Sequence, residues 1–330
     1  MFESIKKVKE QFLWDPEIMG KPLDFAQGKW VKRVIICGVG GSNLASGFLE
    51  MVRPDLEILT HRSYGLPVTV SKNDLIIISS YSGNTEEALD SFEKAVSGRF
   101  NVVAITMGGK LLELVKEKNI PYIQIPQTGI EPRMALGYSL IAMLKAVNDE
   151  ENLIKVQEFG KNFNPENFEK EGRGFAEKLA GKTPIIYSSW NNKAIAYAWK
   201  IKFNETAKIP AFFNVFPELN HNEMVGFVAA NKESKLGFEK EKPSLNINPH
   251  FIFLKDKEDH FRIQKRMEIT EAMLKEKGFG VEVIDLESSV FEKTFNSLAL
   301  IDYASYHFAQ NSGLDPEDSS TIEEFKEKMN

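Results

Sequence analysis

The sequence predicts an α/β protein with two doubly wound domains, each a parallel sheet flanked by helices, and a C-terminal helical tail. Its 330 residues suit two domains of ordinary size. Short apolar runs alternate with helical patterns, as in parallel sheets that are covered on both faces. The series then begins again in the second half, which indicates a loose duplication. We therefore expect domains at residues 1–155 and 156–312 and a tail at residues 313–330.

The first half opens with a helical stripe and continues with strands. Apolar residues at Ile5, Val8, Phe12 and Leu13 predict a helix over residues 3–13 that packs on another element. The expected strands are Val34–Cys37, Leu56–Leu59, Leu75–Ile78, Val102–Ile105 and Tyr122–Ile125. Helical patterns between them include Glu86–Val96 and Lys110–Lys118. The polar, Asn-rich residues 161–170 suit a linker or the start of a helix.

The second half repeats this pattern. Its expected strands are Pro184–Tyr187, Ala211–Phe216, Phe251–Leu254 and Val281–Ile284, with helices at Lys193–Lys208 and Arg262–Lys277. Ligands of such sheets bind at the carboxyl ends of strands, near the switch in strand order. The loops that follow strands are therefore where we look for chemistry.

Composition excludes several classes of protein. A hydrophobic fraction of 42% supports real cores, and a net charge of −6 argues against a nucleic-acid surface. A small anionic substrate remains compatible, because a local site holds a phosphate. Behind its first lysines the N-terminus has no long apolar stretch, and no window is apolar enough to span a membrane. We expect a cytoplasmic protein that binds neither nucleic acid nor membrane.

Cysteine and histidine usage argues against a metal site. Cys37 is the only cysteine, so no intrachain disulfide forms, and its apolar run predicts a buried core position. The five histidines show no HxxxH or HxH spacing. We therefore expect no metal and no cofactor.

The first glycine-rich loop, Gly38–Ser42, follows the first strand. A dinucleotide site would require GxGxxG and an acidic residue at the end of the next strand. Here the sixth position is Asn43, and the next strand ends in Thr60-His61. The dinucleotide interpretation therefore fails, and the loop alone says little.

A second loop, residues 79–87, is more specific. Hydroxyls of Ser80, Ser82 and Thr85 cluster around Gly83, where a helix begins. Free backbone N–H groups and the positive end of the helix dipole converge there, so neutral donors suffice for a phosphate. The alternative is a Ser/Thr-rich cap that merely starts a helix. The chain lacks the Gly-x-x-x-x-Gly-Lys-[Ser/Thr] pattern of a nucleotide-triphosphate loop.

Together these motifs carry a resemblance. Gly40-Gly41-Ser42 followed by Ser80-Tyr81-Ser82-Gly83-Asn84-Thr85-Glu86 is similar to the phosphosugar signature of sugar-isomerase (SIS) domains. The order of later motifs resembles the bifunctional phosphoglucose/phosphomannose isomerases over essentially the whole chain. The resemblance implies two SIS-type domains, phosphate ligands at Ser80, Ser82 and Thr85, and sugar contacts at Gly41 and Ser42.

Aldose–ketose isomerisation of this kind opens the sugar ring and moves a proton between C2 and C1 through an enediol. From its neighbouring sequence alone, Glu205 is expected to be a solvated glutamate on a helix. However, residues 204–208 resemble the family's Asn-Glu-Asn-Ala/Ser-Lys element, whose glutamate is the base. The chain departs from this element at Thr206, which stands where the family has the second asparagine.

Two further residues have matching roles in the family. His221 lies among polar residues after a strand, where it is a poor core residue; its family counterpart assists ring opening from the partner subunit of a homodimer. Glu218 and Glu223 are expected to orient its loop. Arg133 follows Pro132, which places it in the first turn of the next helix. Arg133 is either a surface arginine or, as the resemblance implies, the cation that stabilises the enediolate.

The tail is a loop that feeds a short helix, and Ser320 and Glu323 have capping-box spacing. By itself Lys326 is a solvated lysine. The resemblance implies that it joins the histidine at the ring oxygen, although Lys328 lies only two residues away. Ser319 occupies the position of a small hydroxyl residue beside the sugar.

The resemblance implies interconversion of glucose 6-phosphate, and mannose 6-phosphate, with fructose 6-phosphate. Two alternatives remain open: a SIS isomerase for another sugar phosphate, and a sugar-phosphate sensor without catalysis. A sensor would not need Glu205, His221 and Lys326 together, and no DNA-binding segment or basic stripe accompanies the two domains.

Overall fold

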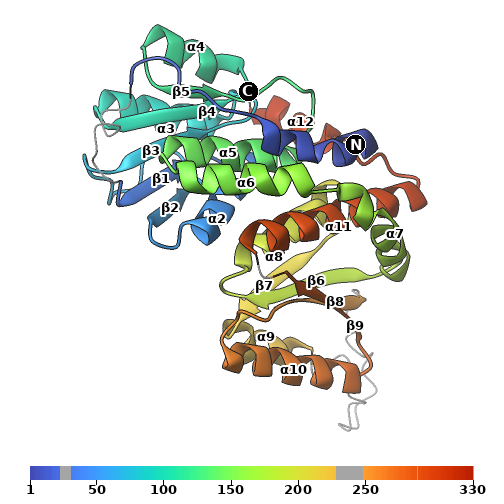
Figure 1. Cartoon of the computed structure of the whole chain (residues 1–330). Helices are drawn as coiled ribbons and strands as arrows, with labels where there is room; N and C mark the ends of the chain where they lie inside the picture. Colours follow the sequence, from blue (N-terminus) through green and yellow to red (C-terminus); the bar gives the residue numbers. More distant parts are fainter. Residues whose placement is uncertain (23–30, 228–247, 288, 330) are drawn as a thin grey trace. The chain divides into compact units, whose positions relative to one another are not determined.

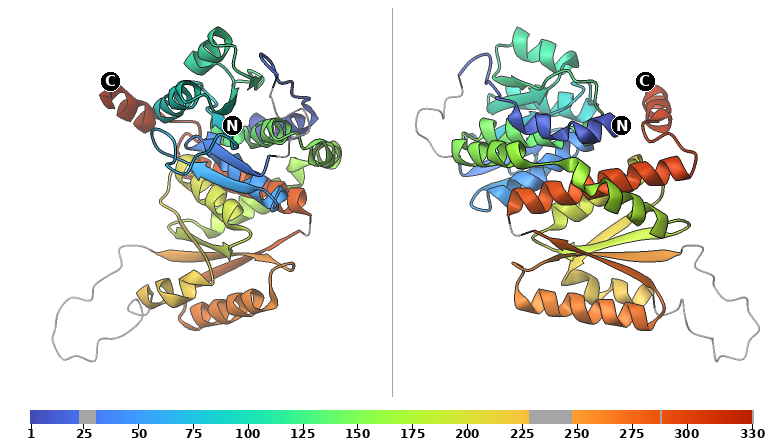
Figure 2. Two further views of the ribbon diagram at one scale, coloured as in Figure 1. Left: turned by 90° about the vertical axis from the view of Figure 1, so that its left-hand side faces the viewer. Right: turned by 45° about the vertical axis from the view of Figure 1, so that its right-hand side comes forward.

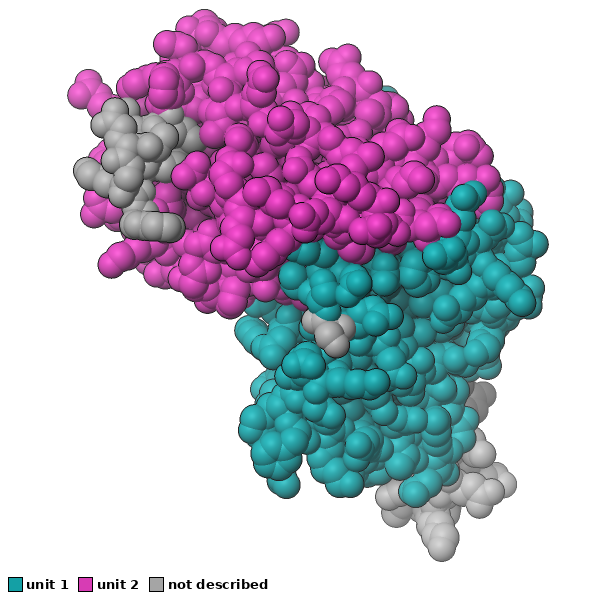
Figure 3. All heavy atoms as spheres, viewed as in Figure 1, with its two compact units in different colours: residues 1, 166–330 teal, residues 2–165 magenta. Residues whose placement is uncertain are grey.

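The computed structural model describes residues 1–22, 31–227, 248–287 and 289–329 (Figure 1). The chain divides into two compact units, coloured separately in Figure 3. Residues 2–165 form the N-terminal unit; residues 166–330, with Met1, form the C-terminal unit. Each contains a parallel sheet flanked by helices, which confirms the predicted fold class. Within the described residues, no helix has the length and apolarity that a membrane span requires.

The N-terminal unit is built on a parallel sheet whose strand order is β2-β1-β3-β4-β5. The strands are β1 (Arg33–Cys37), β2 (Glu57–His61), β3 (Leu75–Ser79), β4 (Asn101–Thr106) and β5 (Tyr122–Gln124). The chain runs outward in one direction from β1 and in the other from β3. The switch in strand order therefore falls between these two strands, where a ligand crevice is expected.

Helices cover both faces of this first sheet. They are α2 (Gly41–Val52), α3 (Glu86–Ser97), α4 (Gly109–Glu117) and α5 (Leu136–Ala146), while α6 (Glu150–Asn162) packs against α5. On one face, Phe92 of α3 and Leu111 of α4 share a core with Ile76 of β3. Cys37 belongs to the same core, and burial raises the pKa of its thiol to about 12. The prediction that Cys37 is a core residue is confirmed.

The N-terminal segment differs from the single helix predicted over residues 3–13. It consists of α1 (Phe2–Lys6) and a 3-10 segment, η1 (Val8–Leu13). Phe12 is buried against Phe159 of α6, with ring centroids 5.3 Å apart, but Leu13 is 53% exposed. Tighter 3-10 winding places residues three apart on one side. Gln11 is thereby buried and bonded to the start of α5, a polar contact that an apolar stripe does not reveal.

The C-terminal unit has a parallel sheet with strand order β7-β6-β8-β9. Its strands are β6 (Thr183–Ser189), β7 (Phe212–Phe216), β8 (Pro249–Asp256) and β9 (Gly280–Leu286). Its helices are α7 (Glu169–Lys178), α8 (Lys193–Glu205), α9 (Glu223–Gly226), α10 (Phe261–Glu276), α11 (Val290–Asn311) and α12 (Ser320–Met329). Figure 2 shows α9 and α10 on one face of this sheet and α11 on the other. The second switch in strand order lies between β6 and β8.

Two element ends differ from their predicted positions. Helix α8 ends at Glu205, three residues before the predicted Lys208, because Lys208 has a left-handed backbone with φ +61°. Helix α12 begins at Ser320, so this serine is the first helical residue and not the cap. Its backbone N–H instead donates to Asp318 Oδ1 at 2.9 Å.

Candidate active site

The loop between β3 and α3 is folded around one buried serine. Ser80 Oγ accepts the N–H of Gly83 at 3.1 Å and donates to Thr85 Oγ1 at 2.9 Å. Thr85 is the N-cap of α3, yet its side chain makes no capping bond, which disfavours the interpretation as a mere helix cap. Ser82 is exposed, and its Oγ accepts the N–H of Asn84 at 3.2 Å. The first turn of α3 has N–H groups without intrahelical acceptors, so the loop can receive an anion.

The first turn of α2, which follows β1, is bonded directly to residues 79–87, which we call the phosphate loop after its predicted ligand. Ser42 Oγ accepts the N–H of Tyr81 at 2.7 Å, and the Ser42 carbonyl accepts the hydroxyl of Ser79 at 2.8 Å. A Cβ atom on Gly41 would lie 2.9 Å from the backbone nitrogen of Arg133. Only glycine permits this close approach. The structure thus brings Gly41, Ser42 and the phosphate loop together at the first switch point.

Arg133 is a buried residue of a 3-10 turn, η3 (Pro132–Met134), and not of the first α-helical turn that the sequence suggested. Its side chain is 3% exposed, so it is not a surface arginine. Its guanidinium Nη1 lies 3.3 Å from Glu131 Oε2. The turn is held from behind by Gln11, whose Nε2 donates to the Met134 carbonyl at 2.7 Å.

Gln11 and the glycine pair after β4 were not predicted to belong to the site. The carbonyl of Gly108 lies where a Cβ atom on Gly83 would fall, and the Asn84 side chain accepts the N–H of Lys110 at 3.0 Å. The loop after β4 therefore supports the phosphate loop from one side. The signal was present as Gly108-Gly109 directly after an apolar strand.

The second switch point has different chemistry. Asn192 Nδ2 donates to Asp256 Oδ2 at 2.9 Å, and Lys293 Nζ lies 2.5 Å from the same oxygen. Burial alone would raise the pKa of Asp256, but the bonds from Lys293 and Asn192 lower it. Burial raises the pKa of the neighbouring Asp259. Two buried carboxyl groups would repel a phosphate, so the duplicated fold does not duplicate the anion site.

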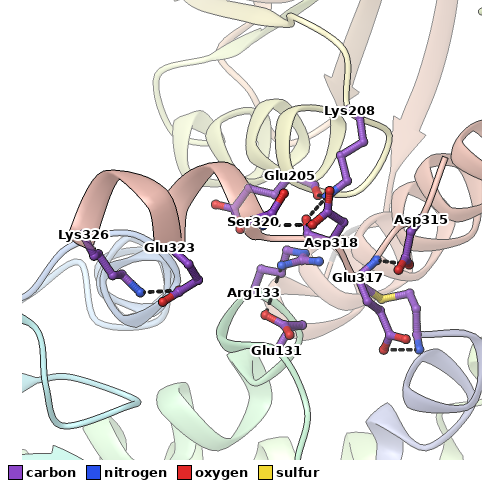
Figure 4. A network of polar contacts seen from close by, with 11 residues as sticks. Glu131, Arg133, Glu205, Lys208, Asp315, Glu317, Asp318, Ser320, Glu323 and Lys326 are labelled. Atoms are coloured by element: carbon purple, nitrogen blue, oxygen red, sulfur yellow. Dashed lines mark hydrogen bonds and ion pairs between the residues drawn. The ribbon is translucent and has the colours of Figure 1, made fainter. Parts of the chain in front are cut away.

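In the C-terminal unit, the end of α8 and the tail are linked. The half-buried Glu205 is the last residue of α8. Lys208 Nζ donates to the Glu205 carbonyl at 2.7 Å and also to the carbonyl of Asp318 (Figure 4). Ser319 follows directly, and its carbonyl accepts the N–H of Glu323 at the start of α12. The segment with the predicted base is thus bonded to the residue that precedes Ser319.

The two tail lysines are bonded within their own helix. Lys326 Nζ lies 2.7 Å from Glu323 Oε1, and Lys328 pairs with Glu324 (Figure 4 shows the first pair). Both lysine side chains are exposed, at 61% and 72%. That Lys326 serves the site stays a prediction.

His221 is presented on a turn that is anchored on both sides. Its side chain is exposed and makes no hydrogen bond or ion pair with the described residues. Before it, Leu219 is buried, and the Asn220 side chain donates to Thr270 of α10 at 3.0 Å. After it, the Glu223 carboxylate accepts the Tyr187 hydroxyl at 2.8 Å.

A second donor, Asn214, also bonds the Glu223 carboxylate. Burial raises the pKa of the Tyr187 phenol, which therefore remains a donor. The sequence-based expectation that Glu223 and Glu218 orient this loop agrees with these bonds, since Glu218 Oε1 accepts the Asn222 side chain at 2.7 Å. The turn holds the imidazole outward. Among the described residues, no group of three or more His, Cys, Asp and Glu side chains is arranged to hold a metal ion.

Comparison with known proteins identifies the family. A family model described as the bacterial phospho-glucose isomerase C-terminal SIS domain matches residues 168–329. The chain is 35% identical to a bifunctional phosphoglucose/phosphomannose isomerase of Caldicellulosiruptor bescii, an alignment that covers 100% of the chain and 98% of the relative. The chain belongs to the family of bifunctional phosphoglucose/phosphomannose isomerases. A second phosphoglucose/phosphomannose isomerase, from Aquifex aeolicus, is 31% identical over 99% of the chain and 98% of its own length.

Solved structures agree on the architecture. The C-terminal domain of the glucosamine-fructose-6-phosphate aminotransferase from Francisella tularensis superposes with a TM-score of 0.64. The match covers 95% of each chain, but the sequences are only 17% identical. This likeness therefore supports the fold of the chain and says nothing of its substrate.

Proposed function

We propose that the chain interconverts glucose 6-phosphate and mannose 6-phosphate with fructose 6-phosphate, through an enediol and without a metal. The observation that carries the proposal is the phosphate loop at the first switch point, bonded to the first turn of α2 at Ser42 in a member of this family. Ser80, Ser82 and Thr85 with the adjacent backbone N–H groups bind the phosphate, and Gly41 and Ser42 contact the sugar. The tail, residues 313–330, completes the site as the third part beside domains 1–155 and 156–312.

In this proposal Glu205 is the base that transfers the proton. As the carboxylate at the end of α8, it removes the proton from C2 and returns it to C1. Arg133 stabilises the enediolate charge, because a buried guanidinium is not screened by solvent. A base and a cation suffice for this chemistry, so the proposal requires no Lewis acid. His221 and Lys326 act at the ring oxygen during ring opening.

One base can serve both aldose phosphates. Glucose and mannose differ only at C2, and both yield the same enediol once that proton is removed. Rotation about C2–C3 before proton transfer then admits either epimer. The small side chain of Ser319 leaves room for this rotation.

A homodimer supplies His221 to the partner's site in this proposal. The support comes from β7, which is an edge strand of its sheet and carries Phe212 at 52% and Phe213 at 36% exposure. Val225, just after the His221 turn, is 70% exposed. An open edge with exposed aromatic residues is a liability unless another chain covers it. A second copy on this edge would bury it and receive the outward-facing His221.

The proposal makes the protein a cytoplasmic enzyme of glycolysis or gluconeogenesis. Activity toward a different sugar phosphate, or binding without turnover, would be the alternatives. A coupled assay with both hexose phosphates, run with EDTA, separates them. Turnover of neither substrate would refute the proposed specificity.

Glu205→Gln is the decisive variant, because it keeps size and hydrogen bonding but removes basicity. We expect kcat to fall at least about 10²-fold, the low end for a general base, with little change in KM. Glu276→Gln is the matched control, since Glu276 ends α10 as Glu205 ends α8. Full activity of Glu205→Gln would exclude Glu205 as the base.

Mixing inactive Glu205→Gln and His221→Ala chains tests the shared site. Hybrid dimers should regain one intact site if His221 crosses the interface. Absence of recovery, with subunit exchange verified, would place His221 and Glu205 of one chain in the same site.

A further inference from the structure

Lys208 occupies a backbone conformation that glycine or asparagine usually takes. It follows α8 with φ +61°, in the left-handed region, where a long side chain is strained. Glycine is the common residue just past a helix end for this reason. An observed outlier of this kind directs attention to what its side chain does.

The side chain of Lys208 folds back over the end of α8. Its ammonium donates to the Glu205 carbonyl at 2.7 Å, a favourable position because the C-terminal end of a helix is electronegative. The same ammonium donates to the carbonyl of Asp318, which lies 110 residues further along the chain (Figure 4). A helix cap would need only the first bond. The second bond goes to the tail.

The bonded part of the tail is itself ordered around Asp318. The Asp318 carboxylate accepts the N–H of Ser320, and this bond lowers the pKa of Asp318. Between them, Ser319 starts α12 by accepting the N–H groups of Ile322 and Glu323. Lys208 is thus hydrogen-bonded to the tail at Asp318, the residue before Ser319.

We propose that Lys208 is a positioning residue, which holds the Glu205 end of α8 and the Ser319 segment of the tail in one arrangement. The role of Glu205 and Ser319 in catalysis rests on the proposed function above. The link that Lys208 makes between the carbonyls of Glu205 and Asp318 does not rest on that function, since it depends only on contacts within the C-terminal unit. Lys208 touches no reacting atom in this proposal; it acts through the backbone of Glu205 and Asp318.

Lys208→Gly separates positioning from stability. Glycine removes the ammonium and also relieves the left-handed strain, so a Lys208 side chain without any role predicts an equal or higher Tm, and a purely structural role predicts a lower Tm; both predict unchanged kinetics. We expect instead that kcat falls between about 10- and 100-fold, because small misplacement of a catalytic group is costly. KM for the phosphosugar should change little, because the phosphate loop belongs to the N-terminal unit.

Amide hydrogen exchange measures directly whether Lys208 holds the tail in place. Backbone amides of residues 319–323 in full-length Lys208→Gly should exchange about tenfold faster, because a charged donor no longer holds the tail. Lys208→Arg, which keeps a cationic donor, should restore most of the protection and of kcat. Arg99→Gly is the matched control: Arg99 has φ +55° in the N-terminal unit, and its replacement relieves similar strain without changing tail exchange or kcat.

The outcomes are distinguishable. Tail exchange in Lys208→Gly equal to that of the wild type would overturn the proposal, whatever the activity. Faster exchange with an unchanged kcat would show that the tail link has no positioning role, which also overturns it. If the wild type proved inactive on hexose phosphates, the proposed function would fail, while the exchange data would still report on the link.

Discussion

Gly83 is the residue at which the phosphate-loop geometry makes the sharpest prediction. Its φ is +73°, and a Cβ atom there would lie 1.8 Å from the Gly108 carbonyl oxygen and 2.7 Å from its carbon. Because the clashing atoms belong to the backbone of Gly108, they cannot move aside as the end of a flexible side chain can. Gly83→Ala therefore has to displace the phosphate loop, the loop after β4, or both.

The size of the effect follows from two separate costs. A left-handed alanine costs about 1–2 kcal/mol in place of glycine. Relief of the clash requires a shift of about 1.5 Å to reach ordinary contact, and overpacking of this kind costs about 1–3 kcal/mol more. Gly65 supplies the control, because its φ of +74° is nearly the same and, its chain neighbours aside, no heavy atom of the described residues lies within 4 Å of its would-be Cβ. Gly65→Ala bears the first cost only, so its Tm should fall by about 2–4 °C per kcal/mol.

Both variants are assayed for Tm, for KM and for inhibition by inorganic phosphate. A shift of more than 1 Å removes one or more hydrogen bonds to a charged ligand, each contributing about 1.5–3 kcal/mol, so KM of Gly83→Ala should rise about tenfold or more. Gly65→Ala should keep the wild-type KM and phosphate inhibition. Wild-type KM and phosphate inhibition in Gly83→Ala, despite a larger loss of Tm than in Gly65→Ala, would refute this loop as the phosphate site.

Four further outcomes are expected. Ser82→Ala should raise KM and weaken inhibition by phosphate with little loss of Tm, because Ser82 is exposed; unchanged phosphate inhibition would count against it as a ligand. Glu223→Gln weakens the bonds from Tyr187 and Asn214, so turnover of cyclic substrate should fall more than that of the open-chain form, while Glu268→Gln, an exposed α10 variant, should change neither. Burial lowers the pKa of His250 below 6.5, so the unfolded state binds more protons and stability is lost as the pH falls below about 6.5; in His250→Leu the difference in Tm between pH 7.5 and pH 5.5 should shrink, and an equal difference would contradict this assignment. Activity should survive EDTA, and loss on chelation with recovery on adding zinc would refute the metal-independent mechanism.

The strands and the phosphate loop were accessible from the sequence because their signals are local. A parallel strand buried on both faces has to be apolar throughout, so runs such as Val34–Cys37 and Leu75–Ile78 predicted β1 and β3 to within one residue. The hydroxyl cluster around Gly83 is likewise contained within one turn. The polar neighbours of His221 already favoured a site position for it, but the specific roles of Glu205, His221 and Lys326 came only from the resemblance, and they remain predictions.

Helix α11 had no such local signal. Its residues are buried on most sides, including polar ones such as Ser297 and Ser305, so it lacks the apolar stripe of a surface helix. No element was predicted there. Only the tertiary structure shows that this 22-residue helix packs against α7 and α8 and is largely buried.

The sequence by itself determined the α/β class, the duplicated strand series and the hydroxyl-rich loop that we predict to bind phosphate. Tertiary structure alone decided the polar contacts that fix the site groups: Gln11 on Met134, Tyr187 on Glu223, and Lys208 on Asp318. Burial of an apolar run depends on its own composition and length. A hydrogen bond depends on which distant backbone or side-chain group arrives within about 3 Å, and residues 110 or more positions apart share no local pattern that records it.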